Sequence, residues 1–201
     1  MPDLSDEAET LAVAKARLRA AVLGRRRKLT ASALADAAAR VQAELASVVR
    51  RGAPRLVCGY VPIAGEPGGS NLPDVLVRAV AGSAEVLLPV LREDLDLDWG
   101  RYAGPSSLTL TTRRLREPVG ARLGVDAVRE ADLVVVPAVA VDRRGVRLGR
   151  GGGSYDRVLA RVGNAYTVAL LHEGEVVDAV PAQPHDAAVR AAITPAELVE
   201  F

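Results

Sequence analysis

A glycine-rich run lies between a strand pattern and a helix pattern, and this order restricts the fold more than any other feature of the chain. Residues 133–137 read Leu-Val-Val-Val-Pro, which is typical of a strand buried on both faces. Four of the five residues 149–153 are glycine, and apolar spacing predicts a helix over residues 154–162. A buried strand, a loop and a helix in this order indicate an α/β protein, in which ligands bind near the carboxyl ends of the strands.

The same alternation of apolar runs and helical segments extends along the rest of the chain. Apolar residues at helical spacing predict two opening helices, over residues 11–22 and 34–48, with Thr30 or Ser32 as the cap of the second. The other predicted elements are strands over residues 56–61, 85–90 and 166–171, a helix over 71–80, an irregular strand or hairpin over 91–102, and a terminal helix from Pro195 capped by Thr194. We therefore predict a single three-layer α/β domain over residues 1–201, with a mostly parallel sheet flanked by helices and residues 1–8 as a flexible tail.

Composition argues against several classes of protein. Hydrophobic residues make up 49% of the 201 residues, and the net charge of +1 gives no general attraction to nucleic acid or to membranes. The chain shows no signal-peptide pattern and no apolar run near the roughly 20 residues that span a bilayer. Its one cysteine, Cys58, cannot form a disulfide within the chain. We expect a cytoplasmic monomer without a nucleic-acid or membrane partner, in which the basic run 25–28 is solvated at the end of the first helix.

The glycine loop, residues 149–153, has the properties of an anion site. Glycines let the backbone approach a ligand closely and turn successive N–H groups toward one point, and the next helix adds the positive end of its dipole. Arg150 adds a charge within the loop. The loop is not a Walker A motif, because no Gly-Lys-Ser/Thr ends it, and Ser154 replaces the third glycine of a dinucleotide motif. The alternative is a surface loop whose glycines only turn the chain.

The glycine loop belongs to a longer run, residues 147–157, that reads Arg-Leu-Gly-Arg-Gly-Gly-Gly-Ser-Tyr-Asp-Arg. Shorter motifs surround it in a fixed order: Lys15 and Arg19, Tyr60-Val61-Pro62 followed by Glu66, Leu88-Pro89-Val90, Glu117-Pro118, Val136-Pro137, Asp142, Pro181 and His185-Asp186. From about residue 12 to residue 195, this combination resembles the 5-formyltetrahydrofolate cyclo-ligase family, also called methenyltetrahydrofolate synthetases.

The resemblance implies an ATP-driven ring closure that needs ATP and Mg²⁺. In this reaction ATP phosphorylates the formyl oxygen of 5-formyltetrahydrofolate, N10 attacks the activated carbon, and phosphate leaves to give 5,10-methenyltetrahydrofolate. Positioning and charge neutralisation are the main tasks of a protein in phosphoryl transfer. The implied partners are therefore ATP and a reduced folate.

Carried over residue by residue, the resemblance implies a nucleotide site built around the glycine loop. Arg150 and Tyr155 are the expected catalytic residues. The expected nucleotide-binding residues are Lys15, Arg19, Arg147, Gly149, Arg150, Gly151, Gly152, Gly153, Ser154 and Tyr155. Asp156 and Asp186 are the expected magnesium carboxylates, because phosphate-bound Mg²⁺ usually takes only one or two carboxylates.

The expected folate residues are Glu66, for the paired donors of the pterin ring, and Tyr60 and Trp99. The chain departs from the family pattern on this side of the site: Ser154 stands where a second tyrosine is usual, Val141 replaces an aromatic, and a glutamine is usual near Glu175. Two alternatives therefore stay open. One is a nucleotide- or RNA-binding relative without this activity, motivated by the arginines at 25–28 and 113–116, and the other is an ATP-dependent ligase acting on another formylated or carboxylated substrate.

Overall fold

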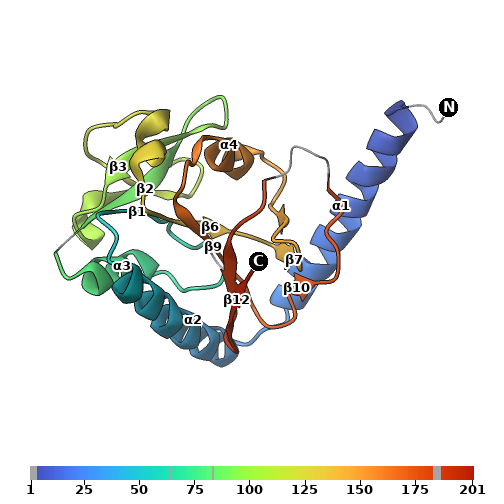
Figure 1. Cartoon of the computed structure of the whole chain (residues 1–201), viewed down its shortest axis with the longest axis horizontal. Coiled ribbons are helices and arrows are strands. Elements are labelled where there is room, and N and C mark those ends of the chain that lie inside the picture. The colour runs from blue at the N-terminus through green and yellow to red at the C-terminus, as the bar shows by residue number, and fades with distance from the viewer. Residues whose placement is uncertain (1–3, 64, 83, 183–186) are drawn as a thin grey trace.

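The main sheet forms the centre of the protein. The computed structural model describes residues 4–63, 65–82, 84–182 and 187–201, with side chains from residue 9 onward. Within these residues the main sheet has seven strands in the order β12-β11-β9-β6-β1-β2-β3 (Figure 1). Its strands are β1 (Leu56–Cys58), β2 (Glu85–Leu91), β3 (Leu97–Arg101), β6 (Leu133–Pro137), β9 (Tyr166–Leu170), β11 (Ala191–Ile193) and β12 (Leu198–Glu200). The five inner strands are parallel, and β3 and β12 pair antiparallel at the two edges.

Helices cover both faces of this sheet, which confirms the predicted three-layer α/β domain. On one face, α2 (Ala31–Gly52) and α3 (Leu72–Val80) pack on alternate strand residues such as Val135 and Leu170. On the other face, α4 (Ser154–Arg161) and the 3-10 helix η2 (Val125–Glu130) pack on the intervening residues, such as Val134 and Val136. This period of two is what a strand buried on both faces requires.

The helix α1 (Leu4–Arg26) lies apart from the main layers and packs on a second, smaller sheet (Figure 1). That sheet comprises β10 (Val176–Val177), β7 (Ala140–Asp142) and β8 (Arg147–Leu148). Val22 of α1 is fully buried in a cluster with Val139 and Leu148. The C-terminal half of α1 is thereby held against the strand that leads into the glycine loop.

A two-stranded hairpin, β4 (Leu108–Leu110) and β5 (Arg116–Pro118), follows the short 3-10 helix η1 (Pro105–Ser107). It is tied to the sheet by Glu117, whose Oε1 accepts a 3.0 Å hydrogen bond from the backbone N–H of Leu91. The sequence did not predict either small sheet, because their strands are two or three residues long.

Three details differ from the prediction. The chain ends in a strand and not in a helix: Thr194 does cap, but its Oγ1 accepts from the N–H groups of Ala196 and Glu197 in a turn, after which β12 pairs with β11. The first strand stops at Cys58, and α1 begins at Leu4, inside the segment expected to be a tail.

The predicted cap of α2 is confirmed: Thr30 Oγ1 accepts from the N–H of Ala33 at 3.2 Å. In the described part of the chain, no helix has both the length and the apolar character needed to span a bilayer.

Candidate active site

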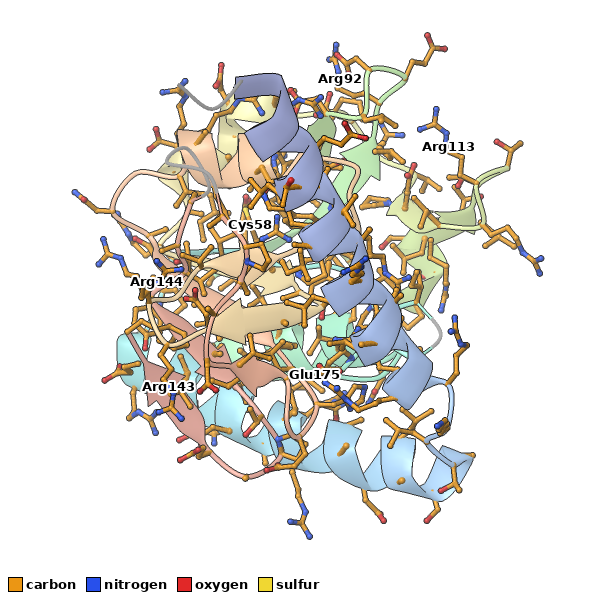
Figure 2. The ribbon with its side chains drawn as sticks, turned by 90° about the vertical axis from the view of Figure 1, so that its right-hand side faces the viewer. Cys58, Arg92, Arg113, Arg143, Arg144 and Glu175 are labelled. Atoms are coloured by element: carbon orange, nitrogen blue, oxygen red, sulfur yellow. The ribbon has the colours of Figure 1, made fainter. Side chains whose placement is uncertain are left out.

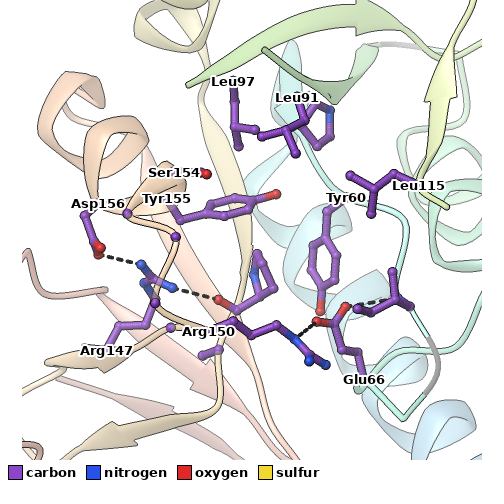
Figure 3. A pocket seen from close by; sticks show the side chains of 18 of the residues that line it. Tyr60, Glu66, Leu91, Leu97, Leu115, Arg147, Arg150, Ser154, Tyr155 and Asp156 are labelled. Carbon is purple, nitrogen blue, oxygen red and sulfur yellow. Dashed lines mark hydrogen bonds and ion pairs between the residues drawn. The ribbon is translucent and has the colours of Figure 1, made fainter. Parts of the chain in front are cut away.

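A cavity of about 280 Å³ opens at the carboxyl ends of the parallel strands β1, β2 and β6 (Figure 3). This is the position where open α/β sheets bind ligands. The cavity brings together segments from six parts of the chain. Its lining includes Lys15 and Arg19 of α1, Tyr60, Val61, Ile63 and Glu66 after β1, Pro89 and Leu91 of β2, Leu97 of β3, Leu115, Arg116 and Glu117 of the β4–β5 hairpin, Pro137 and Ala138 at the end of β6, and the run from Arg147 to Asp156.

The glycine loop forms one wall of the cavity, directly before α4. Gly151 and Gly153 have φ values of 104° and 71°, a region that L side chains rarely adopt. Gly153 is the residue before the helix, and its carbonyl accepts from the N–H of Arg157 at 3.2 Å. Arg19 donates from Nε to the carbonyl of Gly149 at 2.7 Å. The loop is thus held by α1, and a second cationic residue, Lys15 on the same helix, also faces the cavity.

Arg147 connects the glycine loop to α4 and to the end of β6. Its side chain is buried, and it donates from Nη2 to Asp156 Oδ1 at 2.6 Å and from Nη1 to the carbonyl of Pro137 at 3.1 Å. Its guanidinium also lies 5.9 Å from the centre of the Tyr155 ring. Arg147 therefore fixes both sides of the loop and leaves the more exposed Arg150 to reach a ligand.

Glu66 and Arg150 meet across the cavity. Arg150 Nε donates to Glu66 Oε1 at 2.9 Å, and Glu66 Oε2 accepts from the N–H of Ile63 at 3.0 Å (Figure 3). The Glu66 side chain is 8% exposed, so this carboxylate lies in the wall and not in open solvent. The residue expected for the pterin and the residue expected for phosphate are therefore neighbours.

Tyr60 and Tyr155 provide the aromatic surface of the cavity. Burial, and next the charge of Glu66, raises the pKa of both phenols well above the ordinary tyrosine value. Both hydroxyls therefore stay protonated and can donate. Tyr60 Oη makes a 3.4 Å contact with the carbonyl of Pro67, and among the described residues the buried Tyr155 Oη has no hydrogen-bond partner.

Trp99 does not contribute to the cavity, contrary to the prediction. Its side chain is fully buried in the core cluster that contains Val128 of η2. The backbone N–H of Leu123 donates to the Trp99 carbonyl at 2.9 Å, so the segment before η2 covers the strand at this point. Three leucines, Leu91, Leu97 and Leu115, occupy the apolar wall instead (Figure 3).

Sequence reasoning missed the contribution of the β4–β5 hairpin. Leu115, Arg116 and Glu117 line the cavity from this hairpin, and Glu117 is buried. Glu117-Pro118 is one of the short motifs of the sequence, but the hairpin's position depends on strand pairing that the sequence pattern does not reveal.

The structure describes only one of the two expected magnesium carboxylates. Asp156 lines the cavity with a side chain that is 50% exposed. Asp186 lies outside the described residues. Among the described residues, no cluster of three or more His, Cys, Asp or Glu side chains could hold a metal ion by itself.

One residue of the basic run 25–28 is also placed differently from the prediction. Arg26 is 5% exposed, and it forms a buried ion pair with Glu175 at 2.7 Å. The run is therefore not a simple solvated helix end, and Arg26 is not available to contact nucleic acid.

Comparison with known proteins agrees with this geometry. Residues 12–195 match the 5-formyltetrahydrofolate cyclo-ligase family. The chain belongs to this family. A 5-formyltetrahydrofolate cyclo-ligase from Mycolicibacterium smegmatis is 40% identical over 187 residues, which are 90% of this chain and 93% of the relative. The Escherichia coli cyclo-ligase is 30% identical over 149 residues, 72% of this chain and 80% of the relative.

Solved structures give the same result for the cyclo-ligase fold. The structure of 5,10-methenyltetrahydrofolate synthetase from Aquifex aeolicus has a TM-score of 0.77 and 29% identity, and the match covers 92% of each chain. A synthetase from Mycoplasma pneumoniae, at 16% identity and a TM-score of 0.69, shares the fold over 89% of this chain and 97% of its own. The predicted family, fold class and enzyme class are confirmed.

Proposed function

We propose that this cyclo-ligase family member uses ATP to convert 5-formyltetrahydrofolate into 5,10-methenyltetrahydrofolate, with release of ADP and phosphate. One observation carries the proposal: a single cavity is lined by the glycine loop, by three cationic side chains, from Lys15, Arg19 and Arg150, and by the nearly buried carboxylate of Glu66. Such a cavity suits a polyanion at one end and a ring with paired donors at the other.

The glycine loop is the proposed site for the terminal phosphates of ATP. Backbone N–H groups of residues 149–153 would donate to phosphate oxygens, and Arg150 would add a planar cation that matches phosphate geometry. Lys15 and Arg19 approach from α1, and Arg19 already fixes the carbonyl of Gly149. Ser154 begins the helix that follows the loop and lines the cavity beside it.

The residues at this end also fit a phosphate-bound magnesium ion. Asp156 presents a half-exposed carboxylate beside the loop. One or two carboxylates near phosphates are the usual protein contribution to such a site, so the donor set fits magnesium better than a metal that needs a full protein cage. Asp156, with Asp186, would hold the ion, which would neutralise charge on the phosphate oxygens.

The other end of the cavity is the proposed folate site. Glu66 would accept from the amino group and ring N–H of the pterin, and Tyr60 would lie along the ring. Tyr155 would lie between the two ends, where its Oη, which has no hydrogen-bond partner among the described residues, would donate to the formyl oxygen or to phosphate. Leu91, Leu97 and Leu115 would exclude water from the reacting atoms.

The proposed chemistry needs no covalent bond to the protein. The formyl oxygen attacks the γ-phosphorus as the bond to ADP breaks, and Arg150 stabilises the charge on the transferring group. N10 then attacks the formyl carbon and loses its proton, and the C–O bond breaks so that the oxygen leaves with phosphate. The protein's task is to hold N10, the formyl group and the γ-phosphate in line.

That the protein works as a monomer, and in the cytoplasm, stays a prediction from the sequence.

The test is direct. Purified protein is mixed with 5-formyltetrahydrofolate and Mg-ATP, and the absorbance of the methenyl product is followed. We expect product formation that requires ATP and that falls by about 100-fold or more in Arg150→Ala. Product formation at an equal rate without ATP, or no product at all, would contradict the proposal.

The leucine wall favours one second candidate, an ATP-dependent ligase acting on another formylated or carboxylated substrate. In that case ADP would form only when a different substrate is supplied, and 5-formyltetrahydrofolate would give no methenyl product.

A further inference from the structure

We propose that a buried chain of hydrogen bonds through Arg26, Glu175 and His172 positions Glu66, and that His172 is a positioning residue for the folate end of the cavity. The inference deepens the proposed function, on which it rests for the role of Glu66 as the pterin acceptor.

The first part of the chain is a bidentate ion pair. Arg26 of α1 donates from Nε to Glu175 Oε1 at 2.8 Å and from Nη2 to Glu175 Oε2 at 2.7 Å. The two side chains are 4% and 3% exposed. Figure 2 places Glu175 beside the C-terminal half of α1. Arg26 Nη2 also donates to the carbonyl of Ala138, which lines the cavity, at 2.7 Å.

The second part leads from Glu175 to the loop that carries Glu66. Glu175 Oε2 accepts from the backbone N–H of His172 at 2.7 Å, and His172 Nε2 lies 3.1 Å from the carbonyl oxygen of Gly65. Because a carbonyl oxygen only accepts, His172 Nε2 carries the hydrogen of this bond. His172 is 5% exposed, so no bulk water replaces it as a donor.

The contact acts on Glu66 through one peptide unit. The Gly65 carbonyl and the Glu66 N–H belong to the same planar peptide group. His172 holds the carbonyl side of that group, and the Glu66 N–H donates to the carbonyl of Ile63 at 2.9 Å on the other side. Both the carbonyl and the N–H of this peptide group are held, and this fixes the position of the Glu66 Cα, from which the side chain extends.

A purely stabilising role would not explain this arrangement. Burying an ion pair costs desolvation that its attraction often only balances, so apolar residues of similar size serve stability equally well. A charged pair that also binds the carbonyl of Ala138 and the N–H of His172 is better suited to fixing the positions of these backbone segments. The pair extends over three segments, from α1, from the connection after β6 and from the turn after β9.

The test uses two substitutions of His172 in the full chain. His172→Gln keeps an N–H donor at the place of Nε2, and His172→Leu removes it. We expect His172→Leu to raise the KM for 5-formyltetrahydrofolate by about tenfold while the KM for ATP changes by less than about twofold. We expect His172→Gln to restore the folate KM to within about threefold of the parent. Circular dichroism of both variants checks that they fold like the parent.

A second readout needs no substrate. Amide hydrogen exchange of the peptide that contains Gly65 and Glu66 should be about tenfold faster in His172→Leu than in the parent and nearly unchanged in His172→Gln. Equal increases in both KM values, failure of His172→Gln to restore the folate KM, or unchanged exchange in His172→Leu would each overturn the positioning role. If the parent forms no methenyl product, the proposed function fails, and the exchange measurement still decides whether His172 positions this loop.

Discussion

The Arg150 guanidinium and the Glu66 carboxylate form a 2.9 Å ion pair across the cavity. They come from the glycine loop and from the loop after β1, two segments that are 84 residues apart in the chain. Each residue is the proposed contact for a different ligand. Under the proposed function, the pair marks the boundary between the nucleotide end and the folate end, where the formyl group and the γ-phosphate would meet.

Replacement of Glu66 by glutamine should weaken folate binding selectively. The amide keeps the size of the carboxylate but loses its charge and one of its acceptor oxygens. Hydrogen bonds to charged groups contribute about 1.5–3 kcal/mol, so we expect the KM for 5-formyltetrahydrofolate to rise by roughly 10- to 100-fold with a small change in the KM for ATP. Steady-state kinetics on both substrates measure this. Glu93→Gln, at an exposed acid outside the cavity lining, is the matched control, and an equal effect in the two variants would contradict the assignment.

Substitution of Gly149 by alanine should reduce activity through Arg147. A Cβ at position 149 would lie 2.7 Å from Arg147 Nη1, and this guanidinium is held on both sides by Asp156 and the Pro137 carbonyl. Arg147 would have to move, and the loop with it, so we expect kcat/KM to fall by about tenfold or more. Gly163→Ala, where a Cβ meets no atom within 4 Å, should stay within about twofold of the parent. Similar activities in the two variants would show that the loop tolerates this displacement.

Much of the site was predictable because its signal is local. The glycine loop, the start of α4 near Ser154 and the approach of Glu66 to the sheet end follow from strand, loop and helix patterns over a few residues. The Arg26–Glu175 pair was not predictable, because its members are 149 residues apart and a basic run at a helix end is usually solvated. Trp99 was misplaced for a similar reason, since the segment that covers it, around Val128, is distant in sequence.

At the C-terminus, the local sequence is compatible with two structures. Thr194 followed by Pro195 is a good helix start, and it is also a good turn. The exposed edge of β11 decides between them, since residues 198–200 complete hydrogen bonds that would otherwise be unpaired. Only the tertiary structure contains this information.

Removal of one partner of the buried Arg26–Glu175 pair should be strongly destabilising. Glu175→Leu leaves the Arg26 guanidinium buried without a counter-charge, and we expect a loss of about 3–5 kcal/mol in the free energy of unfolding. Arg26→Met, the other single variant, leaves the Glu175 carboxylate buried in the same way. The double variant Arg26→Met with Glu175→Leu removes both charges and should recover most of this loss. Urea unfolding of the parent, both single variants and the double variant gives the values. Additive losses in the double variant would mean that the two charges are not coupled.

The stability of the protein should depend on pH through His172. Burial lowers the pKa of His172 below its ordinary value of 6.5. In the unfolded chain this imidazole takes up a proton near pH 6.5, so the folded state is favoured above that pH and loses stability as the pH falls below it. We expect the free energy of unfolding of the parent to fall more steeply between pH 7 and pH 5 than that of His172→Gln. Carboxylates with a lowered pKa, such as Asp96, lose their contribution at lower pH, near and below 3.8, and are present in both proteins. Parallel curves between pH 7 and pH 5 would exclude His172 as the source.

If ATP activates the formyl oxygen inside this cavity, that oxygen leaves with phosphate, and its fate can be measured. 5-Formyltetrahydrofolate carrying ¹⁸O in its formyl group is converted by the protein with Mg-ATP, and the released phosphate is analysed by mass spectrometry. We expect one ¹⁸O atom in each phosphate, in proportion to the methenyl product formed. Methenyl product accompanied by unlabelled phosphate, with the ¹⁸O recovered in water, would contradict it.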